Sequence, residues 1–349
     1  MEPDWSDFRK RLESSKRILI SSHVKIDGDG LGSELALLHA LRRLGYEATA
    51  LNPGFPPETF RCLGRDFDEI RVYTDSPSES DVDASRIMSR EEALTYDTLI
   101  IVDTSARPQL QKVVELTQEP SIQTLIIDHH ALSETLTPYN YSDSDAPAAG
   151  ALVMDLLEFL GTPLDYRESN DVWSIAELLF FAIATDTGWF RFSSTRPKTF
   201  LQAARLAQSG ASTDLLYSYA YENYSPARIK LLSVVTTNAQ LFCEGKAAFS
   251  WISNEDFRRF NATYNETTDL VNTMFMTKGV EVALLFSELE GGSVRIGFRS
   301  CCDFDVAAIA AAYGGGGHKN AAGATLDIGL KEVMEQVVSR IHKQLKTTI

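Results

Sequence analysis

Short apolar segments that alternate with helical segments constrain the fold of the first half of this chain more than any other feature. Residues 17–22, 98–102 and 124–127 are dominated by Ile, Leu, Val and Thr. Such runs are typical of parallel strands that are covered on both faces. Residues 31–44 have leucines at helical spacing, and Gly45 follows as an expected C-cap. The alternation predicts an open, doubly wound, mainly parallel α/β sheet.

Further along the chain the pattern becomes helical, and near the C-terminus it mixes strands with helices. Ser225 and Pro226 are expected to begin one of these helices. Other helices are expected over residues 172–184, 199–208 and 213–219. We therefore predict an α/β domain over residues 1–195, a helical linker over 196–235 and a smaller α+β domain over 236–349.

Polar clusters follow apolar segments at four places in the first half. They are His23 with Asp27 and Asp29, then Asp103, then Asp128 with His129 and His130, and finally Asp186. In an open α/β sheet, ligands bind beyond the carboxyl ends of the strands. Three of the four clusters lie at such ends, so we expect their side chains to converge in space.

Converging carboxylates and imidazoles repel one another unless a cation joins them. Ligands that are rich in oxygen and include some imidazole favour Mn²⁺ or Mg²⁺, and Mn²⁺ accepts histidine more readily. The candidates exceed what one ion needs, whereas two ions roughly 3.5–4 Å apart that share a carboxylate would use them all. Such a pair generates hydroxide from water near neutral pH and holds a phosphoryl group during in-line attack.

Simpler explanations exist for parts of this pattern. Taken alone, Asp103 and Asp186 would be interpreted as turn or helix-capping residues. The glycine-rich residues 28–33 partly match a dinucleotide-binding fingerprint, but Ser33 occupies the third glycine position and Asn52 replaces the expected acid. A nicotinamide enzyme is therefore not expected, and the combination of clusters favours a metal site.

A run of four glycines, residues 314–317, precedes His318 in the C-terminal part. Successive glycines let the backbone approach a ligand closely and direct N–H groups at an anion. Arg299 ends a predicted strand and could bind a phosphate with two hydrogen bonds. We predict a phosphate-binding loop here rather than a flexible surface loop.

The charge and the apolar content of the chain limit its partners. The net charge of −15 argues against binding of long duplex nucleic acid, which requires a basic surface. No apolar run is long enough to cross a bilayer, so no membrane partner is expected. The four cysteines lack a zinc-binding spacing and fit a reducing cytoplasm, where we expect the protein to act.

Together, these motifs resemble the DHH phosphoesterases that carry a C-terminal DHHA1 domain. The matching residues are His23-x-x-x-Asp27-x-Asp29, Asp103, Asp128-His129-His130, Thr185-Asp186-Thr187-Gly188 and Gly315-Gly316-Gly317-His318. They occur in the family's order across nearly the whole chain. Residues 186–192 are similar to the oligoribonucleases (nanoRNases) of this family that also remove phosphate from 3′-phosphoadenosine-5′-phosphate. Lys25 and Ile26 depart from the family, in which Asn-Pro is common before the second ligand.

The resemblance implies a site with two Mn²⁺ ions, which Mg²⁺ or Co²⁺ could replace. One ion would be held by His23, Asp27 and Asp103, and the other by Asp29, Asp103, His129 and Asp186. The expected catalytic residues are Asp103, Asp128, which would orient the histidines, and His130, which would contact the substrate phosphate. The expected substrate-binding residues are Arg299, Ser300, Gly315, Gly316, Gly317 and His318.

The predicted activity is hydrolysis of short oligoribonucleotides to mononucleotides, removal of phosphate from 3′-phosphoadenosine-5′-phosphate, or both. The partners would be short RNA or small nucleotides, and the resemblance is compatible with a homodimer. Three alternatives stay open. They are a phosphodiesterase for cyclic or linear dinucleotides (c-di-AMP or pApA, c-di-GMP or pGpG), an inorganic pyrophosphatase, and a nucleotide-sensing protein without catalysis.

Overall fold

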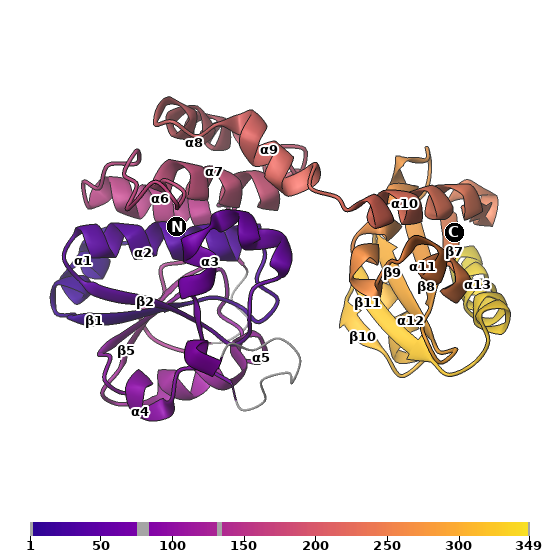
Figure 1. Ribbon diagram of the computed structural model, residues 1–349, viewed down its shortest axis with the longest axis horizontal. Helices are drawn as coiled ribbons and strands as arrows, with labels where there is room; N and C mark the ends of the chain where they lie inside the picture. Colours follow the sequence, from indigo (N-terminus) through magenta and orange to yellow (C-terminus); the bar gives the residue numbers. More distant parts are fainter. Residues whose placement is uncertain (1–2, 75–83, 131–134, 348–349) are drawn as a thin grey trace. The chain divides into compact units, whose positions relative to one another are not determined.

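The computed structural model describes residues 3–74, 84–130 and 135–347 of the chain. It divides into two compact units, Met1–Asn223 and Tyr224–Ile349 (Figure 1). Each unit contains one sheet with hydrophobic clusters on both of its faces. Within the described ranges, no helix is both long enough and apolar enough to cross a membrane.

The first unit is built on a five-stranded parallel sheet with the order β3-β2-β1-β4-β5. The strands are β1 (Arg17–Ser21), β2 (Glu47–Asn52), β3 (Arg71–Val72), β4 (Thr98–Val102) and β5 (Gln123–Ile127). The predicted α/β fold is therefore confirmed. The chain crosses from β3 back to the centre of the sheet at β4, so β1 and β4 are neighbours and their carboxyl ends lie side by side.

Alternate side chains of these strands enter two separate cores. Ile20, Ile100 and Ile127 belong to the larger core, and Leu19 and Ile101 belong to the smaller one on the opposite face. This burial on both sides explains why the strands are almost continuously apolar. The helices that pack in the larger core include α1 (Trp5–Glu13), α2 (Gly28–Arg43), α3 (Arg65–Glu69), α6 (Ala149–Phe159) and α7 (Ile175–Asp186). Those of the smaller core are α4 (Arg90–Ala93), α5 (Arg107–Leu110) and the 3₁₀ helix Gln111–Gln118.

Two of the predicted helices have shifted boundaries because of their capping residues. The helix expected over residues 31–44 begins earlier, as α2, because Asp27 caps it and accepts the backbone N–H groups of Asp29 and Gly30. The helix expected over 172–184 is α7, which a capping box of Ser174 and Glu177 begins and which ends at Asp186. The start of α2 meets the end of α7, since a Cβ atom at Gly28 would be 2.4 Å from the hydroxyl of Thr185.

The second unit contains a six-stranded sheet with the order β10-β11-β9-β8-β7-β6, antiparallel except for the β7–β8 pair. The strands are β6 (Gln240–Phe242), β7 (Ala247–Ile252), β8 (Val282–Glu288), β9 (Val294–Ser300), β10 (Gly316–His318) and β11 (Ala321–Leu326). The helices are α10 (Pro226–Asn238), α11 (Asn254–Phe260), α12 (Val306–Ala311) and α13 (Leu330–Thr347). The predicted α+β character is confirmed, since helices pack against both faces of this sheet.

Residues 196–235, which we predicted to be a linker, are divided between the two units. Helices α8 (Pro197–Gln208) and α9 (Thr213–Tyr221) belong to the first unit, where Gln202 donates a hydrogen bond of 3.1 Å to the carbonyl of Ala151 in α6. Helix α10 belongs to the second unit and packs on β7. Its predicted start is confirmed, because the hydroxyl of Ser225 accepts the N–H of Arg228 at 3.0 Å.

The remaining 3₁₀ segments are Glu58–Leu63, Ala84–Arg86, Cys243–Gly245, Tyr264–Thr267 and Leu270–Met276.

Candidate metal centre

The segment between β1 and α2 contributes the first polar side chains of the site. Asp27 caps α2, and His23 lies with its Nε2 atom 3.8 Å from the Asp27 carboxylate. Gly30 lies close to this pair of side chains. A Cβ atom at Gly30 would be 2.5 Å from the Ser22 hydroxyl and 3.3 Å from both the His23 ring and the Asp103 carboxylate. The absence of a side chain at residue 30 therefore lets the polar groups approach one another.

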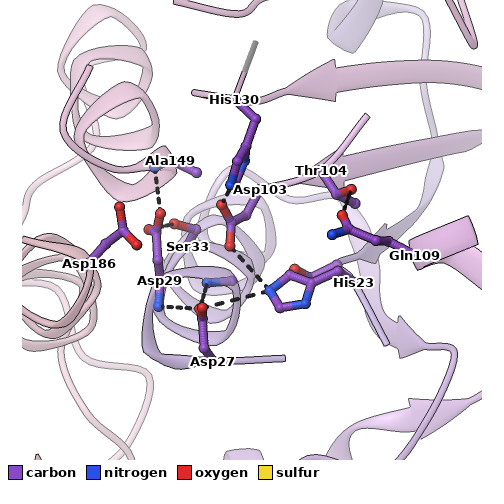
Figure 2. Close-up of polar contacts among 12 residues, drawn as sticks. His23, Asp27, Asp29, Ser33, Asp103, Thr104, Gln109, His130, Ala149 and Asp186 are labelled. Atoms are coloured by element: carbon purple, nitrogen blue, oxygen red, sulfur yellow. Dashed lines mark hydrogen bonds and ion pairs between the residues drawn. The ribbon is translucent and has the colours of Figure 1, made fainter. Parts of the chain in front are cut away.

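Asp29 belongs to α2, but its carboxylate accepts hydrogen bonds from the N-terminus of α6. Its two carboxylate oxygens accept the backbone N–H groups of Ala149 at 2.7 Å and Gly150 at 2.9 Å, and the hydroxyl of Ser33 donates to it at 3.0 Å (Figure 2). Ala148, at the N-cap position of α6, has no side-chain capping bond of its own. Asp29 thus caps α6 in place of a local residue, and its carboxylate orientation is fixed.

Asp103 follows β4 and occupies the centre of the site. Its backbone has φ = 62°, a left-handed conformation that asparagine and aspartate adopt more readily than most residues. One carboxylate oxygen lies 3.3 Å from Nε2 of His23, and the other lies 3.3 Å from Nε2 of His129. The buried Asp103 carboxylate therefore faces two histidines that come from two different strand ends, and Figure 2 shows its contact with His23.

The six side chains that we predicted as metal ligands form two groups that meet at Asp103. In each group the candidate ligand atoms all lie within 4.8 Å of one another. The groups are His23 with Asp27 and Asp103, and Asp29 with His129 and Asp186. The Nε2 atom of His129 is 3.6 Å from carboxylate oxygens of both Asp29 and Asp186, the last residue of α7. The structure therefore brings all four sequence clusters together.

His130 and Asp128 form a pair at the edge of this site. Asp128 is completely buried, and one of its oxygens lies 2.9 Å from Nδ1 of His130 and accepts the backbone N–H of His130 at 3.0 Å. The His130 side chain is 58% exposed, unlike that of His129, which is 13% exposed. The hydrogen bond to Asp128 raises the pKa of His130. Asp128 thus fixes the orientation of a ring that solvent can reach.

Burial and charge perturb the ionisation of the clustered groups. Burial, together with the charges of Asp103 and Asp186, raises the pKa of Asp29 well above its ordinary value. Burial also raises the pKa of Asp186, to about 6. For His23 and His129 burial lowers the pKa, but the neighbouring carboxylates outweigh this effect and raise the pKa values to about 10 and about 9. The clustered carboxylates thus give the site an excess of negative charge, and nearby positive charge stabilises it.

The chemistry of these side chains fits a divalent cation. Among the described residues, one buried oxygen of Asp103 and the buried Nε2 of His129 have no hydrogen-bond partner, although the two atoms lie 3.3 Å apart. Buried polar atoms normally have partners, and a cation accepts electron pairs from both of these atoms. Carboxylates with imidazoles are a typical donor set for Mn²⁺ and related ions. The residues therefore fit the metal site that the sequence predicted.

A further group with a metal-like composition lies elsewhere in the first unit, and we did not predict it. It contains His39 of α2, Asp66 of α3 and Glu168. His39 Nε2 lies 3.0 Å from the Asp66 carboxylate, and both side chains are fully buried. Arg42 lies 3.2 Å from Glu168 and supplies positive charge there. This group is a network of polar contacts, buried at His39 and Asp66, that joins α2 to α3.

The predicted substrate-binding residues lie in the second unit. The hydroxyl of Ser300 donates to the carbonyl of Phe304 at 2.8 Å and accepts from the Asn320 amide at 2.9 Å. Arg299 is partly buried and pairs with Ala321 of β11, and Ala321 pairs in turn with residue 318 of β10. Arg299 and residue 318 therefore lie on either side of Ala321 in the sheet. The side chain of His318 lies outside the described part of the structure.

The glycine run differs from the loop that we predicted. Residues 316–318 form strand β10, antiparallel to β11. A Cβ atom at Gly315 would be 2.1 Å from the carbonyl oxygen of Gly323, and one at Gly317 would be 2.4 Å from that of Ala321. Gly316 has open space where a side chain would be. Close packing against β11 thus explains two of the glycines, and the prediction of a loop was wrong for residues 316–318.

Comparison with known proteins adds an independent line of support. Residues 17–183 match the model of the DHH family N-terminal domain, and residues 244–347 match the DHHA1 domain. The bifunctional oligoribonuclease and PAP phosphatase NrnA of Thermus thermophilus is 28% identical over 98% of this chain and 95% of its own length. The cyclic-di-AMP phosphodiesterase GdpP of Geobacillus thermodenitrificans is 27% identical over 96% of this chain and 48% of its own length.

A solved structure confirms the fold. The crystal structure of an exopolyphosphatase-related protein from Bacteroides fragilis superimposes with a TM-score of 0.79, covers 98% of this chain and 97% of that protein, and shares 23% sequence identity. At this level of identity the likeness supports the arrangement of elements that holds the clustered carboxylates and histidines.

Proposed function

Because the chain belongs to the DHH family of phosphoesterases, with a DHH domain followed by a DHHA1 domain, it is a hydrolase of phosphoester bonds, and we propose that its substrates are short nucleotides. It hydrolyses short oligoribonucleotides to mononucleotides, removes phosphate from 3′-phosphoadenosine-5′-phosphate, or does both. The similarity over nearly full length to a bifunctional oligoribonuclease and PAP phosphatase supports this assignment. The net charge of −15 also disfavours long polyanions.

Two Mn²⁺ ions are the proposed cofactors, with Mg²⁺ or Co²⁺ as substitutes. His23, Asp27 and Asp103 would hold one ion, and Asp29, Asp103, His129 and Asp186 would hold the other. The single observation that carries this proposal is that the two oxygens of Asp103 face two separate ligand groups. Divalent ions at these groups would lower the pKa of water and offset charge on the phosphoryl group.

The residues beside the ligands would orient the substrate. His130 is the exposed ring next to the ligand groups, and Asp128 holds its Nδ1 side. In that orientation the Nε2 side of the ring is available to donate a hydrogen bond to a phosphate oxygen, where negative charge increases during the reaction. The hydrogen bond to Asp128 raises the pKa of His130 and so favours the protonated ring. Asp128 is thus a positioning residue for His130.

In the DHHA1 domain, Arg299, Ser300, Gly315, Gly316, Gly317 and His318 are the proposed substrate-binding residues. The sheet register supports part of this set, because Arg299 and residue 318 pair with Ala321 from the two strands on either side of it. A Cβ atom added at Gly316 would meet no other atom within 4 Å, so a ligand can approach the backbone there. The guanidinium of Arg299 is chemically suited to binding a phosphate group with two hydrogen bonds.

Product analysis with graded substrates tests the proposal. Wild-type protein with Mn²⁺ is incubated with RNAs of two to 24 nucleotides, each labelled at one end, and with 3′-phosphoadenosine-5′-phosphate. We expect mononucleotides from the shortest RNAs, release of phosphate from the small nucleotide, and slow cleavage of the longest RNA. Asp103→Asn, which suits the left-handed backbone, should abolish both activities. Asp214→Asn, a change at an exposed aspartate of α9, is the matched control. Activity that survives Asp103→Asn would contradict the two-ion assignment.

A second candidate function is hydrolysis of cyclic or linear dinucleotides. The observation that favours it is the 27% identity to a cyclic-di-AMP phosphodiesterase over 96% of this chain. Rates on c-di-AMP, c-di-GMP, pApA, pGpG and a five-nucleotide RNA, measured side by side, separate the candidates. A rate on a cyclic dinucleotide that exceeds the rate on every linear substrate would replace the first proposal with the second.

A further inference from the structure

The segment that follows Asp186 has two aromatic residues that turn inward. Trp189 and Phe190 have positive φ values of 58° and 65°, which residues with side chains rarely adopt. The Trp189 ring packs against Tyr217 at 5.2 Å, and the Phe190 ring stacks on Phe200 at 5.6 Å. These two residues anchor the segment in the helical layer of the first unit.

The next two residues, Arg191 and Phe192, are exposed and are held in place by their backbone. Both of their N–H groups donate to the carbonyl of Thr187 at 3.0 Å. Thr187 is completely buried, and its hydroxyl accepts the N–H of Phe190 at 3.1 Å. The segment is therefore a hydrogen-bonded turn, and the direction of the two exposed side chains is set by the fold.

Phe192 exposes an aromatic ring six residues after Asp186, one of the residues of the candidate metal centre. The side chain is 53% exposed, and its ring lies on Gly188, where a Cβ atom would be 2.5 Å from the ring. Gly188 is two residues from Asp186. Exposure of a phenyl ring to water is unfavourable, and here a rigid turn maintains it. The backbone of Gly188 contacts one part of the Phe192 ring, and the rest of the ring is exposed to solvent.

Arg191 adds a positive charge next to this ring. Its Nε atom donates to the carbonyl of Gly188 at 2.9 Å, and its guanidinium carbon is 5.8 Å from the centre of the Phe192 ring. Among the described residues the guanidinium has no salt bridge and no other hydrogen bond. Its terminal nitrogens are thus oriented by the Nε contact and remain available to an anion.

We propose that Phe192 and Arg191 form a nucleotide-binding surface, in which the Phe192 ring stacks on the base and Arg191 binds the non-reacting phosphate of the nucleotide being cleaved. The inference deepens the proposed function and rests on it. A nucleotide has a planar base, a sugar and a phosphate, and the site offers an aromatic face, a guanidinium and a cation-binding cluster around Asp186. Stacking on an aromatic ring accepts any base, which suits an enzyme for RNA of mixed sequence.

Calorimetric binding of two ligands tests the proposal without turnover. Adenosine 5′-monophosphate has the base, and ribose 5-phosphate lacks it. In the full chain with Mn²⁺, Phe192→Ala should weaken binding of the first ligand by roughly 5- to 100-fold and leave the second unchanged. Phe192→Tyr should restore the affinity, and Phe192→Leu, which keeps bulk on Gly188, should not. Arg191→Gln should weaken both ligands.

Phe159→Ala is the matched control, because Phe159 is 43% exposed and is the last residue of α6, at the opposite end from the residues that Asp29 caps. It should bind both ligands as the wild type does. The proposal fails if Phe192→Ala binds adenosine 5′-monophosphate as tightly as the wild type, if it weakens both ligands equally, or if the wild type does not distinguish them. The part played by Arg191 fails if Arg191→Gln binds both ligands normally.

Turnover measured on the same variants separates this inference from the proposed function. With pApA as substrate, Phe192→Ala should raise KM by roughly 5- to 100-fold while kcat changes little. The wild type could hydrolyse none of the nucleotides and yet prefer adenosine 5′-monophosphate, while Phe192→Ala lacks this preference. That result would overturn the proposed function alone. Active wild-type protein with an unchanged KM in Phe192→Ala would overturn this inference alone.

Discussion

The carboxylate of Asp29 accepts the backbone N–H of Ala149 at 2.7 Å, although the two residues are 120 positions apart in the sequence. A carboxylate at a helix N-terminus satisfies N–H groups that have no partner within the helix, and it interacts favourably with the helix dipole. Asp29 also lies in one of the two ligand groups. The same side chain therefore fixes the start of α6 and one wall of the candidate metal centre.

Removal of this cap should be visible in amide hydrogen exchange. In metal-free protein, Asp29→Ala leaves the amides of Ala149 and Gly150 without their acceptor, so their exchange should accelerate at least tenfold relative to the middle of α6. Ser33→Ala, which removes only a hydroxyl that donates to Asp29, is the control and should change these rates much less. Unchanged exchange of Ala149 in Asp29→Ala would show that the cap has no energetic role.

Glu34 should make the stability of the first unit depend on pH. Burial raises its pKa to about 8, although the Asn52 amide donates to it at 2.7 Å. Its folded-state pKa lies above the unfolded value, so its favourable contribution is complete below pH 4.5 and is lost progressively as the pH rises to about 8. Relative to wild type, Glu34→Gln should gain up to about 1.4 kcal/mol of stability per pH unit across this window.

Urea unfolding of metal-free wild type and Glu34→Gln at pH 5, 6.5 and 8 measures this difference. The comparison between two variants cancels the titration of groups they share. A free-energy difference that stays constant from pH 5 to pH 8 would mean that Glu34 is already ionised in the folded protein at low pH.

Asp128 and His130 should act as a unit in catalysis. Asp128→Asn weakens the contact that orients His130, so kcat should fall by about 10- to 100-fold, while the rise in Tm caused by Mn²⁺ persists. His130→Ala should lower kcat by at least as much. Because both changes remove one oriented ring, the double variant should be no slower than His130→Ala. If the fold loss of kcat in the double variant equals the product of the two single losses, Asp128 acts independently of His130.

The glycine run offers a pair of substitutions that separates packing from ligand binding. Gly315→Ala forces a Cβ atom to within 2.1 Å of the Gly323 carbonyl oxygen and should destabilise the second unit by about 1–3 kcal/mol. Gly316→Ala meets nothing within 4 Å and should change stability by less than about 0.5 kcal/mol. If the backbone of residue 316 approaches the substrate, Gly316→Ala should still raise KM. A normal KM in that variant would remove Gly316 from the substrate site.

The central strands could be predicted from the sequence because their physical requirement is local. Strands β1, β4 and β5 are buried on both faces, so almost every position must be apolar. The convergence of His23, Asp103 and His129 follows from the same strands, since the carboxyl ends of parallel neighbours meet at one edge. Asp186 is different, because it ends a helix, and the packing of α7 against α2 and α6 brings it to that edge.

Other elements could not be predicted because their stabilising contacts are distant in sequence. Helix α6 has no capping residue of its own, and the residue that caps it lies far away at position 29. Strand β10 consists largely of glycine, which has no side-chain pattern, and only its pairing with β11 defines it. Similarly, α8 and α9 have helical sequences, but their assignment to the first unit depends on contacts such as that of Gln202 with α6.

The order of the ligands along the chain has a consequence for biosynthesis. The candidate metal centre gathers residues from His23 to Asp186, and α6, which Asp29 caps, lies within that stretch. A ribosome must therefore release all of α7 before the emerging chain can bind a cation in its final geometry, and no part of the DHHA1 domain is needed for that step. Cation uptake by stalled nascent chains would thus record the moment at which the ligand set is complete, before α8, α9 and the DHHA1 domain have been added.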